Sequence, residues 1–387
     1  MAGGVAGEEL LDSVRAALPG LEAEAAESER LRRPTDRAIE ILRGTRCLEQ
    51  LVPRKYGGLE LDLDSFLECA MTLGEADASL AWVANFYTEH NWLFCHMPEE
   101  FQRELFSQRP CVLAPAAIAG ESSVREVDGG FVLDGRWRFG SGAMHAEWVM
   151  VGGASRQGDP TSAHFYALPA EQVTIDDVWH TAGLRATGSN DILVEEAFVP
   201  TDHAASLVAI SAGNGPASKL HAAEVYQSPM VPVLMTAAAT PTIGQARAAV
   251  RRFREKTAER TRPMSQVAER DRAGVQMRLA ESAHETREAE LVMRDVIGEV
   301  MRLRASASLE QRVRWALGMT RAVHGARRAI HRLADAGGAS GQFEHDPLQR
   351  AVRDANAAAS HIAFDWDARH QGLGGVMLGV APNTMLF

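Results

Sequence analysis

His361 is the residue whose neighbours in the sequence best suit proton transfer. An imidazole typically titrates near neutral pH, so it can take up or release a proton under working conditions. If residues 346–369 form one helix, Asp354 and Asp365 share a face with His361, seven positions before it and four after it. A solvated histidine between two acids would have the same spacing. The pattern therefore nominates His361 and leaves its role open.

Two glycine-rich turns carry hydroxyl groups in the middle of the chain. Ser141 lies between Gly140 and Gly142, and Thr187 and Ser189 flank a further glycine. The hydroxyls and backbone N–H groups of such turns can bind a polar group such as phosphate. Each segment also fits a simple glycine turn.

One more histidine and two tryptophans are candidates for contacts with a ligand. His90 and Trp92 lie in the segment 89–100, and Trp137 precedes the Ser141 turn. A tryptophan can form the wall of a pocket for an aromatic molecule, but it more often fills a core. For His90 the alternative is an ordinary core or surface histidine.

Several common enzyme motifs are absent from the sequence. No GxGxxG follows a predicted strand, there is no GxxxxGK[ST], HExxH or GxSxG pattern, and the 13 histidines show no ligand-like spacing. The four cysteines are scattered without a CxxC pair, which argues against a disulfide framework or a zinc site. Hydrolase, P-loop and Rossmann dehydrogenase functions therefore lack their usual sequence support.

The composition excludes further classes of protein. A chain of 387 residues is long enough for two or three core units. The formal net charge of −11 argues against a nucleic-acid-binding surface. No apolar run approaches the roughly 20 residues of a membrane-spanning helix, and the N-terminus lacks the features of a signal peptide. We therefore expect a soluble, cytoplasmic enzyme.

The predicted elements change character twice along the chain. Helical spacing marks four early segments: 8–17, 34–42, 63–73 and 98–107. Strand patterns follow from 111 to 200, and four long helical segments come after them: 230–260, 271–304, 309–336 and 346–369. We predict an α+β protein, mainly α. Its expected parts are an N-terminal helical domain (1–110), a central antiparallel β domain (111–225) and a C-terminal four-helix bundle (226–387).

Three local expectations accompany this layout. Asp134-Gly135 indicates a hairpin turn between two short strands. In the strand at 191–200, one face should carry Ile192, Val194, Glu196 and Phe198. In the last helix, a bundle seam should carry Leu348, Val352, Ala355, Ala359 and Ile362. The stretch 210–229 is expected to be a mobile loop.

Three motifs make the chain similar to acyl-CoA dehydrogenases. VPRKYGGLELD (52–62) resembles the family's P-x-x-YGG loop, GLRATGSNDILVEEAFVP (183–200) resembles its GLRGTGS…VP strand, and RDANAAASHI (353–362) resembles the start of its last core helix. The resemblance covers nearly the whole chain and implies the dehydrogenase layout of helical, β and four-helix domains.

Three segments are closer to the monooxygenase relatives of that family. GRWRFGSGAMHAEW (135–148), EHNWLFCHMPEE (89–100) and RDANAAASHIAFDWD (353–367) resemble segments of two-component flavin hydroxylases, which include 4-hydroxyphenylacetate and polyketide hydroxylases. Many dehydrogenases carry their catalytic glutamate eight residues after the aspartate that is Asp354 here. Ile362 occupies that position and cannot abstract a proton. Some dehydrogenases carry this glutamate on an earlier helix, so that alternative stays open.

The resemblance implies a role for each candidate residue. Ser141 would hydrogen-bond near the flavin N5 or the peroxide formed on the flavin, and His361 would act as a base or stabilise that hydroperoxide. His90 and Trp92 would contact the substrate. The implied flavin-binding residues are Ser141, Thr187, Ser189, Trp137 and Arg262, the last reaching the flavin of a neighbouring subunit, with Arg260 as its competitor.

The function implied is that of the oxygenase component of a reduced-flavin-dependent monooxygenase. It would insert one atom of O₂ into an aromatic or polycyclic substrate, using FADH₂ or FMNH₂ from a separate NAD(P)H-dependent flavin reductase. A homo-oligomer, a tetramer or dimer, is expected, with no metal, nucleic-acid or membrane partner. The alternatives are an acyl-CoA dehydrogenase, an N-oxygenase of an amino sugar, and a flavin-free scaffold.

Overall fold

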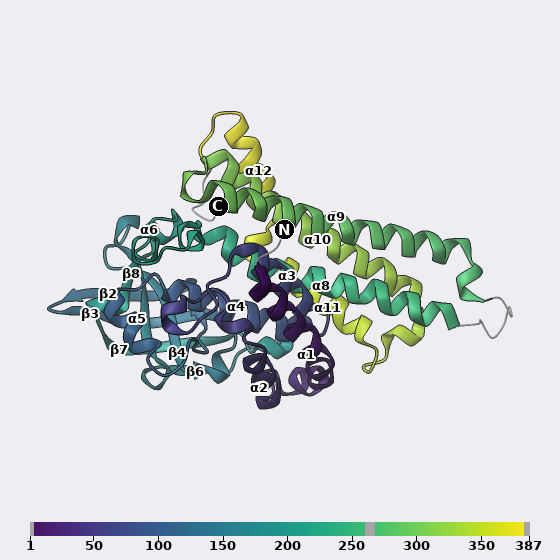
Figure 1. The fold of residues 1–387 in the computed structure, drawn as a ribbon, viewed down its shortest axis with the longest axis horizontal. Coiled ribbons are helices and arrows are strands. Elements are labelled where there is room, and N and C mark those ends of the chain that lie inside the picture. Colours follow the sequence, from purple (N-terminus) through teal and green to yellow (C-terminus); the bar gives the residue numbers. More distant parts are fainter. Residues whose placement is uncertain (1–3, 260–267, 383–387) are drawn as a thin grey trace.

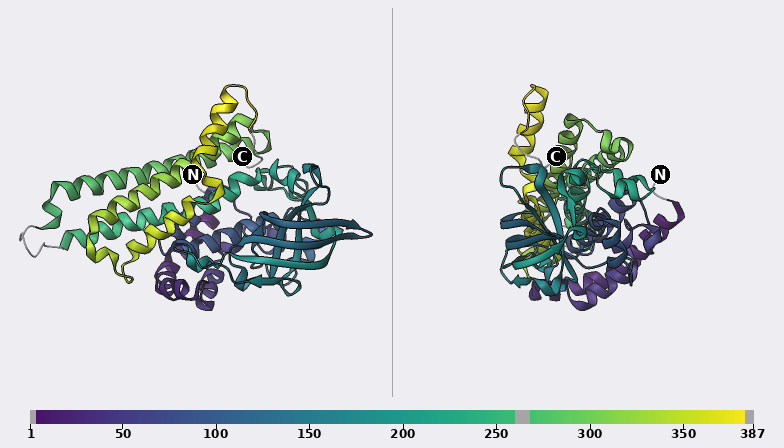
Figure 2. Two further views of the ribbon diagram at one scale, coloured as in Figure 1. Left: turned by 180° about the vertical axis from the view of Figure 1, so that it is seen from behind. Right: turned by 90° about the vertical axis from the view of Figure 1, so that its left-hand side faces the viewer.

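The computed structural model describes residues 4–259 and 268–382 and has three parts (Figure 1). The β sheets occupy one end, long helices extend from the other, and the N-terminal helices lie where the two meet. The view from behind in Figure 2 shows the same arrangement. None of the helices in the described ranges is long and apolar enough to cross a membrane.

The N-terminal part is helical. Its helices are α1 (Gly4–Leu31), α2 (Asp36–Thr45), α3 (Leu63–Gly74), α4 (Ala78–Phe94) and α5 (Glu99–Leu105). Asp77 caps α4 by accepting bonds from the backbone N–H groups of Ser79 and Leu80. The sequence patterns missed α4 because every one of its residues is buried, and a helix that is buried all round shows no amphipathic period.

The β part consists of two four-stranded sheets that are mainly antiparallel. One has the order β1 (Ala116–Ala117), β4 (Trp148–Ala154), β5 (Ala163–Pro169), β8 (Ala204–Ser206), and the other β2 (Gly120–Val127), β3 (Gly130–Gly140), β7 (Asn190–Pro200), β6 (Thr174–Asp176). Their facing side chains form a common core.

Two strand predictions were wrong in detail. β3 continues through Asp134-Gly135 with an irregularity in its pairing, and the hairpin turn lies at the other Asp-Gly pair, Asp128-Gly129, between β2 and β3. In β7 the inward face is even-numbered as far as Val194 and odd-numbered at Val199, so Phe198 is 49% exposed. The change occurs at Glu196, whose positive φ of 45° breaks the two-residue alternation.

The C-terminal part is a helical bundle. Its long helices are α8 (Met230–Glu259), α9 (Ala273–Leu303), α10 (Leu309–Gly337) and α11 (Pro347–Ala359), followed by α12 (Trp366–Met377). α10 packs against the other four. This mainly α arrangement confirms the predicted fold class.

The prediction of one helix over 346–369 was wrong. α11 ends at Ala359, and His361 adopts an extended conformation and caps a short 3₁₀ turn at residues 362–364. Asp365 then caps α12 by accepting a bond from the N–H of Ala368. These local side-chain bonds compete with a continuous helix. As a result Ile362, expected in the bundle seam, is 69% exposed.

The stretch 210–229, expected to be a mobile loop, is largely short helical turns. It contains the end of α6 (Leu207–Ser211), α7 (Ala217–Leu220) and a 3₁₀ turn at residues 224–227. Tyr226 is buried and donates a hydrogen bond to the carbonyl of Leu51 at 2.9 Å. The stretch is therefore anchored to the N-terminal part.

Candidate functional site

The structure joins the three predicted hydroxyls, Ser141, Ser189 and Thr187, into one hydrogen-bonded chain. The Oγ atoms of Ser141 and Ser189 are 2.9 Å apart, and Ser189 Oγ lies 2.7 Å from Thr187 Oγ1. Thr187 donates its own proton to the Leu184 carbonyl at 2.8 Å. At the other end, the indole N–H of Trp82 donates to Ser141 Oγ at 3.0 Å. The proton of Ser141 is thus shared with Ser189, and a ligand acceptor can compete for it.

The two glycine-rich turns are held together by main-chain contacts. Gly142 N–H donates to the Thr187 carbonyl at 2.8 Å, and the Tyr87 hydroxyl donates to the Gly142 carbonyl at 2.7 Å. Gly142 has a φ of +78°, and a Cβ there would lie 2.4 Å from the Tyr87 hydroxyl oxygen. Glycine is therefore required for this turn to approach α4.

His361 also contacts Trp82. Its ring centroid is 5.7 Å from that of Trp82, and its Nδ1 accepts a hydrogen bond from the N–H of Ala363 at 3.2 Å. Burial lowers the pKa of His361 to about 4, so the ring is neutral at pH 7. Because Nδ1 is an acceptor, the ring proton must sit on Nε2. His361 therefore presents a hydrogen-bond donor.

The two predicted acidic neighbours of His361 have other functions. Asp365 caps α12, and Asp354 is buried and accepts the Leu184 N–H at 2.7 Å. Burial raises the pKa of Asp354 to about 7. A Cβ on Gly183 would lie 2.0 Å from the Arg353 carbonyl, so glycine lets the loop with Thr187 and Ser189 touch α11. The prediction of a shared helical face was wrong because the helix ends before His361.

His90 is linked to Trp82 by an aromatic row along α4. The ring centroids of Trp82 and Phe86 are 5.1 Å apart, and those of Phe86 and His90 are 5.4 Å apart. His90 donates its Nδ1–H to the Ala114 carbonyl at 2.6 Å. Burial lowers the pKa of His90 to about 4. The ring is neutral at pH 7, and its Nε2 is an acceptor.

Two predicted residues, Trp92 and Trp137, are not brought to this site. Trp92 is fully buried and donates to the Val225 carbonyl at 3.2 Å, and Trp137 is fully buried between the sheets and donates to the Gly152 carbonyl at 2.7 Å. Both indole donors are already bonded, so their functional roles stay predictions that this packing does not favour. Arg262 and its competitor Arg260 lie outside the described residues.

Sequence reasoning missed two aromatic residues, one within the site and one next to it. Trp82 contacts both Ser141 and His361, and its eight-residue spacing from His90 was the available signal. Phe139, two residues before Ser141, is 58% exposed with a φ of +69°, and its ring lies 6.3 Å from that of Trp179. An exposed aromatic ring on a strained backbone next to a hydroxyl fits a planar cofactor. We call Trp82, Ser141, Thr187, Ser189 and His361 the junction site.

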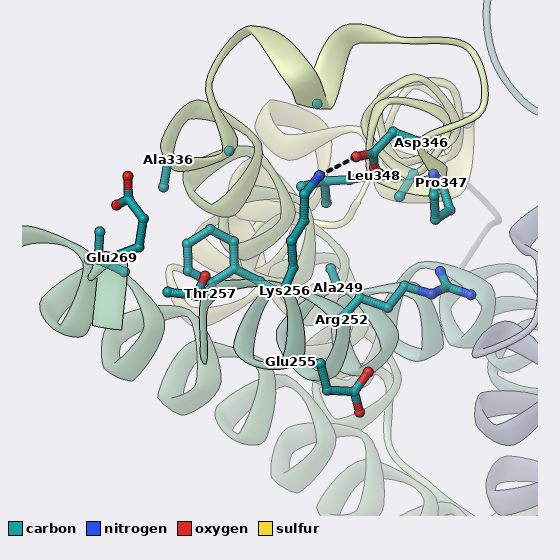
Figure 3. Close-up of a pocket in the computed structure, with 15 residues that line it drawn as sticks. Ala249, Arg252, Glu255, Lys256, Thr257, Glu269, Ala336, Asp346, Pro347 and Leu348 are labelled. Atoms are coloured by element: carbon teal, nitrogen blue, oxygen red, sulfur yellow. Dashed lines mark hydrogen bonds and ion pairs between the residues drawn. The ribbon is translucent and has the colours of Figure 1, made fainter. Parts of the chain in front are cut away.

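A separate pocket lies in the helical bundle (Figure 3). It has a volume of about 310 Å³ and is lined by parts of α8 and by the connection from α10 to α11. Lys256 reaches across to Asp346, with 2.7 Å between Nζ and Oδ2. This ion pair leaves Lys256 engaged with Asp346, and none of the predicted site residues within the described ranges lines the pocket.

Comparisons with known proteins place the chain in a family. The model of the acyl-CoA dehydrogenase C-terminal domain matches residues 236–366. The chain is 30% identical to a pigment production hydroxylase from Rhodococcus sp. (strain ATCC 21145), over 95% of each chain. It is also 30% identical to the oxygenase component of an FADH₂-dependent resorcinol hydroxylase from Rhizobium sp. (strain MTP-10005), over 92% of this chain and 91% of the relative. The chain belongs to the oxygenase components of two-component flavin-dependent monooxygenases.

A solved structure of the same family has the same fold. The crystal structure of 3-HSA hydroxylase from Rhodococcus sp. RHA1 superimposes with a TM-score of 0.92 at 29% identity and covers 98% of this chain and 99% of the other. The predicted resemblance and the predicted monooxygenase class are thereby confirmed. Within the described ranges no group of three or more His, Cys, Asp or Glu side chains is placed to hold a metal ion.

Proposed function

We propose that this monooxygenase hydroxylates an aromatic substrate at the junction site, using reduced flavin delivered by a separate reductase. One observation carries the proposal: Trp82, Ser141 and His361, from three parts of the chain, meet through a 3.0 Å hydrogen bond and a 5.7 Å ring contact. From Trp82, the aromatic row on α4 continues through Phe86 to His90.

Flavin would be held by the hydroxyl chain and by aromatic faces. Ser141 can give its proton to a ring nitrogen of the flavin, while Ser189 and Thr187 fix its position from behind. Phe139 offers an exposed ring on one side of Ser141. Reduced flavin, when bound, supplies the electrons that activate O₂. The residues present fit either FAD or FMN.

His361 would serve as a neutral donor toward the activated oxygen. Its Nε2–H remains available because Nδ1 is already bonded to the Ala363 N–H. A fixed donor in a dry site stabilises developing negative charge more than the same donor would in water. Ser141 is only 8% exposed, and this exclusion of water protects the oxygen from wasteful release as H₂O₂.

The name of one relative supports a separate reductase as the partner. The resorcinol hydroxylase relative is named as an oxygenase component, which implies a second, reducing component. We propose the same division for this chain, with flavin passing between the proteins by diffusion. We also propose a homo-oligomer, a dimer or tetramer.

Isotope labelling tests the proposed reaction. Purified protein is mixed with an unrelated NADH-dependent flavin reductase, FAD or FMN, NADH and ¹⁸O₂. Phenol, resorcinol and 1-naphthol serve as substrates. Mass spectrometry should detect a product that contains one ¹⁸O atom.

Two controls complete the test. His361→Ala should release H₂O₂ in place of the labelled product. Reduction of bound flavin by an acyl-CoA, with no labelled product from any of the aromatic compounds, would overturn the proposal.

A further inference from the structure

Asp354 holds the backbone of Leu184 from the neighbouring helix α11. It is 3% exposed, and its Oδ1 accepts the Leu184 N–H at 2.7 Å. Leu184 has a φ of 50° and a ψ of 35°, a left-handed conformation that leucine rarely adopts. Such a conformation persists only where the surrounding structure fixes it. The hydrogen bond to Asp354 is one of these constraints.

The carbonyl of Leu184 anchors the hydroxyl chain of the junction site. It accepts the Thr187 hydroxyl proton at 2.8 Å and the indole N–H of Trp179 at 2.8 Å. Because Thr187 donates its proton to Leu184, its Oγ1 must accept from Ser189. Ser189 in turn is bonded to Ser141. The position of the Ser141 hydroxyl thus depends, through this chain, on one strained backbone unit.

A buried ion pair joins α11 to α4. Nε of Arg350 lies 3.2 Å from Oδ2 of Asp77, and the two side chains are 13% and 3% exposed. Asp77 caps α4 five residues before Trp82, and His361 follows the end of α11 at Ala359 by two residues. The ion pair therefore connects the two elements that place Trp82 and His361, while Asp354 connects α11 to the hydroxyl chain.

Five charged groups lie together around these contacts. Three are acids and two are arginines: Glu29, Asp77 and Asp354, with Arg350 and Arg353. Burial raises the pKa of Asp354, and the charge of Asp77 raises it further. Burial likewise raises the pKa of Asp77. A neutral side chain at position 354 is therefore compatible with its surroundings, provided that it can accept a backbone hydrogen bond.

We propose that Asp354 is a positioning residue for the junction site. By holding the N–H of Leu184 it keeps the left-handed turn in place, and this turn holds Thr187 and Ser189 behind Ser141. Asp354 acts through the backbone of Leu184 and is not itself a catalytic residue. The inference rests on the proposed function, because it assumes that Ser141 bonds to flavin.

Two variants of Asp354 and one control separate positioning from general stability. Asp354→Leu keeps the approximate volume and removes the acceptor, and Asp354→Asn keeps an acceptor and removes the charge. The control is Asn356→Leu on the same helix. Asn356 accepts hydrogen bonds from Arg327 and His331 of α10 at 2.7 and 2.9 Å, so its loss disturbs α11 without touching Leu184.

The affinity for reduced flavin is the first measurement. Each protein is titrated calorimetrically with reduced FMN and reduced FAD in the absence of O₂. Asp354→Leu should raise the Kd about tenfold, the loss of roughly one hydrogen bond. Asp354→Asn should stay within about threefold of wild type, since its amide oxygen replaces the carboxyl acceptor. Asn356→Leu should bind flavin like wild type even though its Tm falls.

A double-mutant cycle with Ser189→Ala tests the route of the effect. If Asp354 acts through the hydroxyl chain, Asp354→Leu should raise the Kd less than about twofold in the Ser189→Ala protein, because that chain is already broken. A merely structural role would give the same rise in both backgrounds, and that result overturns the proposal. Wild-type affinity in Asp354→Leu, or no binding of reduced flavin by wild type, also overturns it.

Two further points keep the outcomes distinguishable. If Asp354→Leu does not fold, the smaller Asp354→Ala takes its place with the same expected values. The flavin titrations involve neither O₂ nor an aromatic substrate, so they are independent of the ¹⁸O experiment. Labelled product from wild type together with an unchanged Kd in Asp354→Leu would overturn the positioning role and leave the proposed function standing.

Discussion

A histidine lies at each end of the aromatic row on α4, and the two rings differ in which nitrogen carries the proton. His361, next to Trp82, uses Nδ1 as an acceptor and presents an Nε2–H donor. His90, at the other end, donates its Nδ1–H to Ala114 and presents Nε2 as an acceptor. Burial lowers the pKa of both rings to about 4, so both are neutral at pH 7. The contrast between donor and acceptor is therefore not a difference in charge.

This contrast shows that the backbone decides what each imidazole can do. A backbone N–H fixes one tautomer and a backbone carbonyl fixes the other. An oxygen-activating end gains from a donor, because negative charge develops on oxygen there. A substrate-binding end gains from an acceptor, because a hydroxyl group brings its own proton.

The largest expected effect is at the donor end. His361→Ala removes the donor and should lower the rate of hydroxylation about 100-fold, as loss of one positioned donor does in other enzymes. His361→Gln carries an amide N–H near the position of Nε2–H and should recover part of the rate. The measurement is the ratio of hydroxylated product to H₂O₂. Equal ratios in wild type and His361→Ala would remove His361 from the mechanism.

The acceptor end should affect binding more than turnover. His90→Leu removes the acceptor and should raise KM for a phenol about tenfold, the loss of roughly 1.4 kcal/mol expected for one hydrogen bond. kcat should change less than KM, because His361 is untouched. His90→Gln, whose amide oxygen can accept, is the matched control. A large loss of kcat with an unchanged KM would contradict the division into two ends.

Much of this site could be predicted from the sequence, but its hydrogen bonding could not. The similarity of the GLRATGS and RFGSG segments to known motifs located Ser141, Thr187 and Ser189, which the fold then joins into one chain. The tautomer of His361 depends on the break after Ala359, and periodicity in 346–369 predicted no break there. Trp92 and Trp137 have suitable side chains, yet both fill the core.

Other features leave no mark in the sequence at all. In the sequence, Glu89 looks like any other acidic residue. Its carboxyl group lacks a hydrogen-bond partner among the described residues because α4 is buried on every side. Phe139 becomes notable through a backbone angle that the residue type does not reveal. Such strain and isolation arise from tertiary packing, which overrides local preferences at functional sites.

The pH profile should distinguish the two imidazoles more finely. With both pKa values near 4, hydroxylation should show no histidine inflection between pH 5.5 and 7.5. At lower pH, protonation removes the acceptor of His90, whereas protonated His361 still donates from Nε2. The acid limb should therefore persist in His361→Gln and shift in His90→Gln. An inflection near pH 6.5 that disappears in His361→Gln would contradict the assigned neutral donor.

The smallest expected effect concerns Phe139, which lies beside the donor end. Phe139→Gly removes the exposed ring and should weaken flavin binding about fivefold, the usual worth of one aromatic contact. The free energy of unfolding should change by less than about 1 kcal/mol, because relief of the strained φ offsets the greater backbone freedom that glycine has when unfolded. Fluorescence titration with FAD and FMN and a thermal melt measure the two quantities. Phe139→Tyr keeps the ring and should bind like wild type. If Phe139→Gly binds flavin as tightly as wild type does, the strain at this position is unrelated to the cofactor, and the donor end rests on Trp82, Ser141 and His361 alone.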